Sequence, residues 1–338
     1  DLHRRRHSFP TRRSSDLSKF DQFIDLSEMT LFAAIETVRK IGLDIAINLN
    51  GHTAHNRTEF FEHRIAPIQV NYLGYAGTMG AKFMDYIIAD KTVIPSNNCE
   101  FYTEKVAYLP YSFFVSSYVQ SALPNIPTRQ EQQLPECSFV FCCFNNSHKI
   151  TPDVFDIWMR LLKQVEGSVL WLSKQSSTVI SNLRCEAEKR GITPDRLVFS
   201  QKLDSHDAHL ARHVLADVFV DTLHYNAHTT AADALWAGLP VLTCLGQSFA
   251  SRVSASLLRA LGLNELVTLS IQEYEALALE LAQTPHKLRA LKEKLAINKL
   301  TRPLFDTTMT VRHLENAYMQ MHARYRQGLK PDTISVLA

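Results

Sequence analysis

The sequence of 338 residues lacks the marks of several large protein classes. No apolar run approaches the ~20 residues that a membrane-spanning helix needs, so we expect no membrane segment. Its six cysteines show no Cys-x-x-Cys spacing, which argues against zinc and disulfides and favours reduced cysteines in a cytoplasmic protein. The 46% hydrophobic and 21% charged residues are typical of a globular protein, and the length allows two domains.

The net positive charge of the chain comes from its first 17 residues. The formal net charge is +2, but residues 1–17 hold five arginines and two aspartates, so the remainder carries about −1. This leaves no general basic surface for nucleic acid. Residues 7–17, HSFPTRRSSDL, look like the translation of a sequencing-adapter oligonucleotide, and the alternative is a disordered basic arm. We therefore expect residues 1–17 to be non-native and the natural reading frame to begin near Ser18, with the true N-terminus missing.

Helical and strand patterns alternate along the chain, which predicts an α/β fold with parallel sheets. In the first half, a helix stopped by Gly42 precedes strands at 44–50, 68–74 and 85–90. About three strands can be counted there, fewer than a complete doubly wound domain has. We predict a partial first Rossmann-like domain, which is what an N-terminal truncation would leave.

The second half has the pattern of a complete Rossmann-like domain. Its predicted strands are SFVFCCF (138–144), SVLWL (168–172), LVFS (197–200), VFV (218–220) and VLTCL (241–245). A helix over 151–165 begins with Thr151 as cap and Pro152 at its first position. The predicted divisions are a first domain at 18–115, a linker at 116–135, a second Rossmann-like domain at 136–305, and a C-terminal helix and tail at 306–338. The helix over 308–326 could pack across both halves.

The stretch NAHTTAAD, residues 226–233, joins a predicted strand to a predicted helix. The N-terminus of a helix has N–H groups without intrahelical partners and the positive end of the helix dipole, and it therefore binds anions. In the alternative interpretation, a threonine merely caps the helix. A cap needs one hydroxyl and leaves His228 and Asp233 unexplained, so phosphate binding is the favoured hypothesis.

Polar side chains also follow two other strands of the same predicted sheet. Lys149 comes after the strand at 138–144, and His209 and Arg212 lie three residues apart after the strand at 197–200. Singly, these could be a solvated loop charge and an exposed helix face. The carboxyl ends of the strands form the ligand-binding edge of such a sheet, so together they predict a diphosphate site. No Gly-x-Gly-x-x-Gly, P-loop or Asp-x-Asp is present, so we expect no NAD, other cofactor or metal, and neutralisation by Lys, Arg and backbone dipoles.

Three blocks of the sequence resemble the catalytic region of the O-GlcNAc transferase and SPINDLY family, glycosyltransferase family 41. They lie at 48–90, 144–172 and 221–243, and the similarity extends from about residue 20 to about 332. The resemblance implies a bacterial-type GT-B fold, in which two Rossmann-like domains hold a nucleotide sugar between them. It also implies inverting, metal-independent transfer of a sugar, most simply GlcNAc from UDP-GlcNAc, to Ser or Thr of acceptor proteins.

The resemblance carries over to individual positions. Lys149 matches the lysine that holds the diphosphate and stabilises the leaving nucleotide, and is the first candidate catalytic residue. His209 and Arg212 match base-contacting residues, and Thr229 and Thr230 match phosphate-binding threonines. The full set of implied donor-binding positions is Asn146, Lys149, His206, His209, Arg212, His228, Thr229, Thr230, Asp233, Leu73 and Gly74.

The resemblance implies two further roles, and a third candidate residue does not depend on it. Asp233 matches an acid that contacts the ribose, and Leu73 and Gly74 fall where the first half of the family lines the sugar. His52, in the segment NGHT, is a second candidate catalytic residue, as a base, although a histidine on a turn after a strand is often structural.

The sequence departs from the animal enzymes at several of these positions. Asn146 replaces Gln, His206 replaces Lys, Ala227 replaces Gly and Ala76 replaces Pro. His206 leaves the donor open, so GDP-fucose and a non-catalytic nucleotide-sugar-binding protein remain alternatives. The family's tetratricopeptide array and a segment with a proposed catalytic histidine would lie upstream of Ser18. We therefore expect this chain alone to bind nucleotide weakly and to catalyse no measurable transfer.

Overall fold

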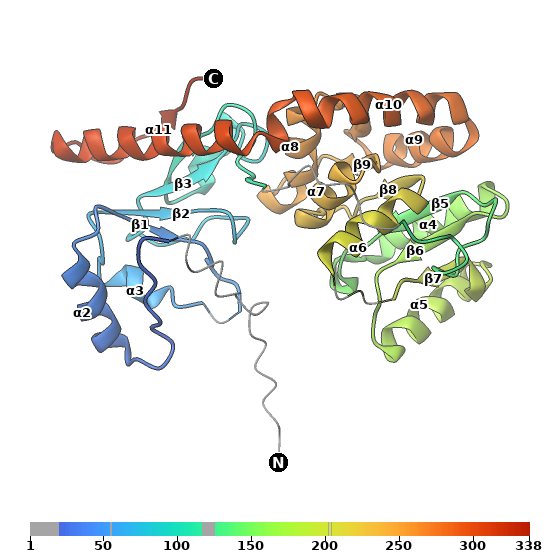
Figure 1. The fold of residues 1–338 in the computed structure, drawn as a ribbon, viewed down its shortest axis with the longest axis horizontal. Coiled ribbons are helices and arrows are strands. Elements are labelled where there is room, and N and C mark those ends of the chain that lie inside the picture. Colours follow the sequence, from blue (N-terminus) through green and yellow to red (C-terminus); the bar gives the residue numbers. More distant parts are fainter. Residues whose placement is uncertain (1–19, 55, 117–125, 202, 204) are drawn as a thin grey trace, which may run out of the picture.

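The computed structural model describes residues 20–54, 56–116, 126–201, 203 and 205–338, so the predictions for 1–17 lie outside the described residues. The chain forms two parallel β-sheets with helices packed around them, as predicted (Figure 1). The first sheet has the strand order β1-β2-β3-β4-β11, and the second has the order β10-β9-β8-β5-β6-β7. Parallel neighbours require crossover connections, which helices supply in most cases, whereas the connection from β2 to β3 contains no helix.

The first sheet contains more strands than the sequence predicted. Its strands are β1 (Ile45–Asn48), β2 (Ile68–Asn71), β3 (Tyr86–Ala89), β4 (Lys105–Tyr108) and β11 (Ile334–Ser335). The first three confirm the predicted strands, but the count of about three was wrong. Strand β4 begins with an exposed lysine and has only three buried residues, and β11 is two residues long. Strand β11 exists because Ile334 and Ser335 pair with β4, a contact between the chain's end and its first half.

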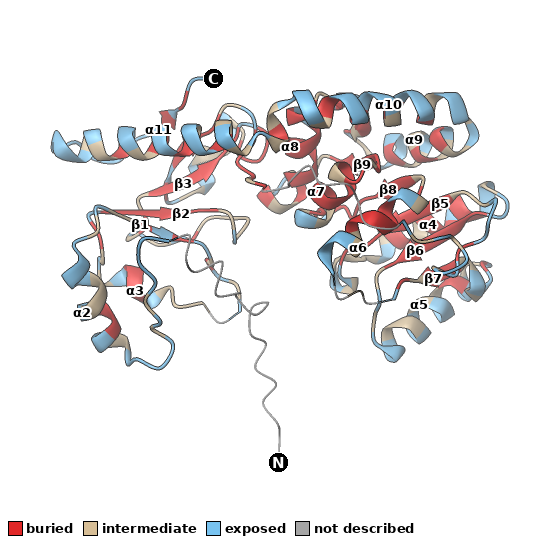
Figure 2. Ribbon diagram, viewed as in Figure 1, coloured by how far each residue is buried: buried red, intermediate tan, exposed pale blue. Residues whose placement is uncertain are grey.

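Local signals place the helices of the first half. Helix α2 (Leu31–Ile41) begins at Thr30, whose side chain accepts from the Ala33 amide, and ends at Gly42 with φ 72°, as predicted. The short helix α3 (Glu59–Glu62) follows β1. Helix α11 (Thr307–Arg326) confirms the predicted C-terminal helix. It lies against the first sheet, where it contacts β2 and β11, and it buries Leu314, Ala317 and Met321 (Figures 1 and 2).

The second sheet confirms the predicted complete set of strands. Its strands are β5 (Val140–Cys143), β6 (Val169–Leu172), β7 (Leu197–Phe199), β8 (Val218–Val220), β9 (Val241–Cys244) and β10 (Val267–Thr268). The helices associated with it are α4 (Pro152–Gln164), α5 (Ser177–Lys189), α6 (His206–Arg212), α7 (Thr229–Trp236), α8 (Val253–Ala260), α9 (Ile271–Gln283) and α10 (Pro285–Thr301). Thr151 and Pro152 occupy the predicted cap and first position of α4.

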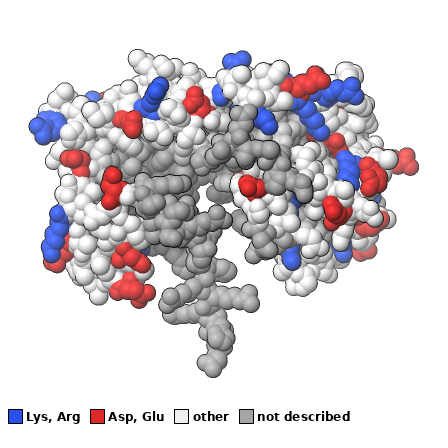
Figure 3. All heavy atoms as spheres, in the orientation of Figure 1, with Lys and Arg blue, Asp and Glu red and all other residues white. Residues whose placement is uncertain are grey.

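The two sheets share one hydrophobic core cluster, and a smaller cluster lies beneath α2 and α3. A polar contact also joins the halves: Ser256 of α8 donates to the buried carboxylate of Asp90 at 2.6 Å, just after β3. Arg252 donates to the Thr92 carbonyl oxygen nearby. These contacts hold the loop after β3 against α8. On the face shown in Figure 3, Lys and Arg are interspersed with Asp and Glu over both halves.

Candidate donor-binding site

The segments that follow β5 and β8 meet at the carboxyl edge of the second sheet. Strand β5 runs into Asn145 and the short 3-10 helix η2 (Ser147–Lys149), while β8 leads through Asp221 to α7. The Lys149 ammonium donates to the Asn226 carbonyl oxygen at 2.9 Å. The structure thus brings Lys149 and the NAHTT stretch together, as the sequence predicted.

Lys149 is partly buried, and its ammonium group lies beside hydrogen-bond acceptors. Its ammonium group lies over the ring of Tyr225, 4.0 Å from the centroid. Burial lowers the pKa of Lys149, whereas the charge of Asp221 acts to raise it. A cation held in this way is incompletely solvated, so an anion beside it would recover part of the lost solvation.

His228 forms the joint between the loop and α7. It occupies the cap position, stacks on Tyr225 with ring centroids 4.8 Å apart, and its Nε2 lies 3.3 Å from the Ala250 carbonyl oxygen. Burial, with the charge of Lys149, lowers its pKa to about 4, so the ring is neutral at neutral pH. Thr229, the first residue of α7, is exposed beside it. Asn146 is also exposed, at the start of η2.

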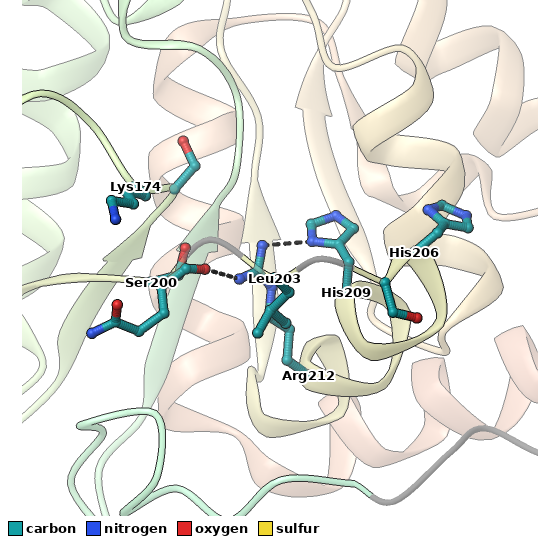
Figure 4. A pocket seen from close by; sticks show the side chains of 9 residues that line it. Lys174, Ser200, Leu203, His206, His209 and Arg212 are labelled. Atoms are coloured by element: carbon teal, nitrogen blue, oxygen red, sulfur yellow. Dashed lines mark hydrogen bonds between the residues drawn. The ribbon is translucent and has the colours of Figure 1, made fainter. Parts of the chain in front are cut away.

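A second set of residues surrounds a cavity of about 420 Å³ beside α6 (Figure 4). In this cavity Arg212 makes a hydrogen bond with His209 and donates to the Gln201 carbonyl oxygen at 2.8 Å. The Arg212 guanidinium lies over the ring of Phe144, 4.5 Å from its centroid. Lys174 lies across the cavity from this pair (Figure 4).

Two buried polar atoms at this cavity have no hydrogen-bond partner among the described residues: Ser200 Oγ and Arg212 Nε. The side chains are 3% and 5% exposed, so water does not fully satisfy them. The buried Asp233 carboxylate lies 3.7 Å from His206 Nε2 and 3.8 Å from His209 Nε2. Burial lowers the pKa of His209 to about 4, assisted by the positive charge of Arg212. The cavity therefore offers neutral and cationic donors, and the Asp233 carboxylate lies against two of its lining histidines.

The first half contributes the loops after β1 and β2. His52 is exposed, its Nε2 lies 3.0 Å from the Met79 carbonyl oxygen, and its ring meets Tyr75 edge to face at 5.2 Å. Leu73 has φ 68°, which strains a non-glycine residue. A Cβ at Gly74 would lie 1.8 Å from the Leu49 carbonyl oxygen, so this position requires glycine.

Tyr75 and Tyr225 connect the two sets of predicted residues. Burial raises the pKa of Tyr225, and the nearby Tyr75 phenol raises it further. Tyr75 meets the ring of His52 edge to face, and Tyr225 contacts Lys149. The loop that carries Gly74 and Tyr75 is therefore close enough to Tyr225 for the two phenols to interact.

Sequence reasoning gave no role to Asn145, Asp221 or Tyr225. Asp221 is fully buried and accepts from the Ala227 amide at 2.7 Å and from Thr243 Oγ1 at 2.8 Å. Its position directly after a strand was the signal that could have identified it. Asn145 has the same position after β5. Tyr225 carried no such signal, because its contacts with Lys149 and His228 depend on how the loop folds.

Within the described ranges, no group of three or more His, Cys, Asp or Glu side chains is placed to hold a metal ion. In the same ranges, every helix is too short or too polar to cross a membrane. Of the six cysteines, none forms a disulfide; Cys142, Cys143 and Cys244 are buried, and Cys137 and Cys185 are exposed.

The chain is similar to known proteins along most of its length. The sequence profile of Glycosyl transferase family 41 matches residues 10–124 and 119–314. The chain is 38% identical over 326 residues to the probable UDP-N-acetylglucosamine–peptide N-acetylglucosaminyltransferase SEC of Arabidopsis thaliana, a match that covers 95% of this chain and 33% of that protein. It is 29% identical to the UDP-N-acetylglucosamine–peptide N-acetylglucosaminyltransferase of Caenorhabditis elegans, covering 96% and 38%. The chain thus spans about a third of the length of these relatives.

Solved structures give the same picture of the fold. A mutant of the O-GlcNAc transferase of Thermobaculum terrenum superposes with a TM-score of 0.85 at 31% identity, covering 92% of this chain and 59% of that one. Sucrose-phosphate synthase from Thermosynechococcus elongatus, at 12% identity, has a TM-score of 0.55 over 87% of this chain and 71% of that one, a likeness of fold alone. The two parallel sheets have the GT-B arrangement that the sequence predicted.

Proposed function

The chain belongs to glycosyltransferase family 41, and we propose that it transfers GlcNAc from UDP-GlcNAc to Ser or Thr hydroxyl groups of proteins, by an inverting reaction without a metal ion. The observation that carries this proposal is the contact between Lys149 and the Asn226 carbonyl oxygen, at the start of α7. It puts a poorly solvated cation beside a helix N-terminus. Such a pair can neutralise a diphosphate through charge and backbone N–H groups.

The cavity beside α6 supports a nucleotide base as its occupant. His209 and Arg212 line the cavity and can donate to the polar edge of a base, and Phe144 packs beneath the Arg212 guanidinium. The Asp233 carboxylate lies 3.7 Å from His206 Nε2 and matches the acid that contacts the ribose in the family. The names of these relatives specify UDP-N-acetylglucosamine, which favours a uracil nucleotide over GDP-fucose.

The proposed reaction exchanges one bond at the anomeric carbon. The acceptor oxygen bonds to this carbon from the face opposite the diphosphate, and the bond between the carbon and the diphosphate oxygen breaks, which inverts the configuration. Negative charge grows on the departing UDP, where Lys149 and the N-terminus of α7 stabilise it. The proton of the acceptor hydroxyl passes to a base.

His52 is the candidate for this base. Its Nε2 is 3.0 Å from the Met79 carbonyl oxygen, an arrangement that requires the hydrogen to be on Nε2. Nδ1 then has a free lone pair and can accept a proton. If His52 is structural instead, it holds the turn through Met79 and takes no part in proton transfer.

Donor binding tests the proposal first. Calorimetry with the full chain should detect UDP-GlcNAc, and UDP should displace it at lower concentration than GDP. More effective displacement by GDP-fucose would support the fucosyltransferase alternative. Transfer of labelled GlcNAc to a Ser/Thr peptide tests catalysis, and donor binding without any transfer would support the non-catalytic alternative. His52→Gln should abolish transfer with donor affinity unchanged.

A further inference from the structure

A chain of hydrogen bonds runs from the interior of the second sheet to the start of α7. Asn145 Nδ2 donates to Asp221 Oδ1 at 3.2 Å, and the Thr230 hydroxyl donates to Asn145 Oδ1 at 2.6 Å. Asp221 is fully buried and Asn145 is 2% exposed. The chain joins the ends of β8 and β5 to the helix that begins with Thr229.

The partners of Asn145 determine which way its amide group faces. Its nitrogen also donates to Thr222 Oγ1 at 2.8 Å. The Thr222 hydroxyl in turn donates its hydrogen to the Tyr225 carbonyl oxygen. Thr222 can therefore only accept from Asn145. Burial raises the pKa of Asp221 to about 6, so at neutral pH it is a carboxylate that also only accepts. A flipped amide would set oxygen against oxygen at both contacts, so Asn145 Oδ1 must face Thr230.

In this orientation of the Asn145 amide, the only hydroxyl hydrogen of Thr230 is used in the hydrogen bond to Asn145 Oδ1. Asn145 Oδ1 cannot donate, so Thr230 must donate to it. The oxygens of a sugar nucleotide's diphosphate only accept at neutral pH, and the Thr230 hydroxyl has no second hydrogen to offer them. Thr229 differs: it is exposed, and its side chain makes no hydrogen bond with any residue that the structure describes.

We infer that the two threonines of the NAHTT stretch have different roles: the Thr229 hydroxyl binds the donor's diphosphate, and the Thr230 hydroxyl belongs to the buried scaffold of Asn145 and Asp221. The inference rests on the proposed function and divides the two threonines that the sequence treated as equivalent. The backbone N–H groups at the start of α7 remain available to phosphate in both cases.

Single valine variants of the full chain separate the two roles. Valine keeps the shape of threonine and removes its hydroxyl. Calorimetry gives the Kd of UDP and of uridine for each variant, and their ratio isolates the phosphate contribution. Thr229→Val should weaken UDP binding about 2- to 10-fold with uridine binding and Tm unchanged, the scale for one hydrogen bond.

Thr230→Val should have the opposite pattern. It leaves the buried Asn145 Oδ1 without its donor, so Tm should fall by roughly 2–4 °C or more, while the ratio of the UDP and uridine Kd values stays that of the wild type. Thr230→Ser retains the hydroxyl and should restore most of the Tm.

The outcomes are distinguishable. A selective loss of UDP affinity in Thr230→Val, equal to or larger than that in Thr229→Val, would overturn the inference and leave the proposed function standing. A wild-type chain that binds UDP no more tightly than uridine would instead overturn the proposed phosphate site and, with it, the inference.

Discussion

The ammonium group of Lys149 lies 4.0 Å from the centre of the Tyr225 ring, in a contact between the segment after β5 and the loop after β8. The same ammonium donates to the Asn226 carbonyl oxygen. The Tyr225 ring and the Asn226 carbonyl oxygen, both in the loop after β8, therefore hold the Lys149 ammonium group near the start of α7. A lysine fixed in this way loses little conformational entropy when a phosphate arrives.

Lys149→Ala should lower glycosyl transfer far more than donor binding. In the proposed reaction Lys149 meets charge that develops as UDP departs, and the loss of one such pre-organised donor costs roughly 10²–10³-fold in turnover. Single-turnover transfer from labelled UDP-GlcNAc by a catalytically active form of the protein measures the effect, with the Kd of UDP-GlcNAc measured in parallel. Turnover above about a third of wild type would remove Lys149 from the mechanism.

Tyr225→Leu should weaken UDP binding, whereas Tyr225→Phe should not. Leucine removes the ring beneath Lys149 and beside His228, and cation–π contacts contribute about 0.5–2 kcal/mol. Phenylalanine keeps the ring and serves as the matched control. Calorimetry with UDP measures both. Equal affinities in the two variants would mean that the ring does not hold Lys149 for the phosphate.

Gly74→Ala should destabilise the protein and Gly77→Ala should do so less. A methyl group at Gly74 meets the Leu49 backbone oxygen at 1.8 Å, so the loops after β1 and β2 must separate, whereas at Gly77 the nearest atom is in the Tyr75 side chain at 3.3 Å. Overpacking of this kind costs about 1–3 kcal/mol. Thermal unfolding of the two variants provides the comparison, and equal Tm values would contradict the assigned contact.

Acid should destabilise the protein as the pH falls from about 6.5 to about 4. Burial lowers the pKa of His209 and His228 to about 4 and that of His213 to about 3, from an ordinary value of 6.5. In this window the unfolded chain takes up protons that the folded chain does not, so stability falls with pH. The Tm measured against pH shows the slope.

Asp221 acts in the opposite direction, because burial raises its pKa from 3.8 to about 6. Between these values the folded chain takes up a proton that the unfolded chain does not, which offsets part of the loss from the histidines. Asp221→Asn removes the offset, so its Tm should fall more steeply with pH below about 6 than that of the wild type. A shallower slope in this variant would show that the sign assigned to Asp221 is wrong.

The sequence alone determined the elements whose signals are local. Buried apolar runs located β5 to β9, and Gly42 located the end of α2. Polar residues directly after strands pointed to the edge where Lys149, Arg212 and Thr229 lie, because parallel strands bring their carboxyl ends to one side of a sheet. The resemblance to family 41 could also be recognised from the sequence, because its motifs are contiguous blocks, and the family profile confirmed it.

Only the tertiary structure decided which groups touch across long separations in the sequence. Strand β11 is two residues long and has no pattern of its own, so its pairing with β4 had to be observed. The sequence also treated Thr229 and Thr230 alike. Their difference arises because Asn145 faces Asp221, so its amide oxygen takes the Thr230 hydrogen. A hydrogen bond needs a donor and an acceptor at a set distance, and that distance is a property of the folded chain.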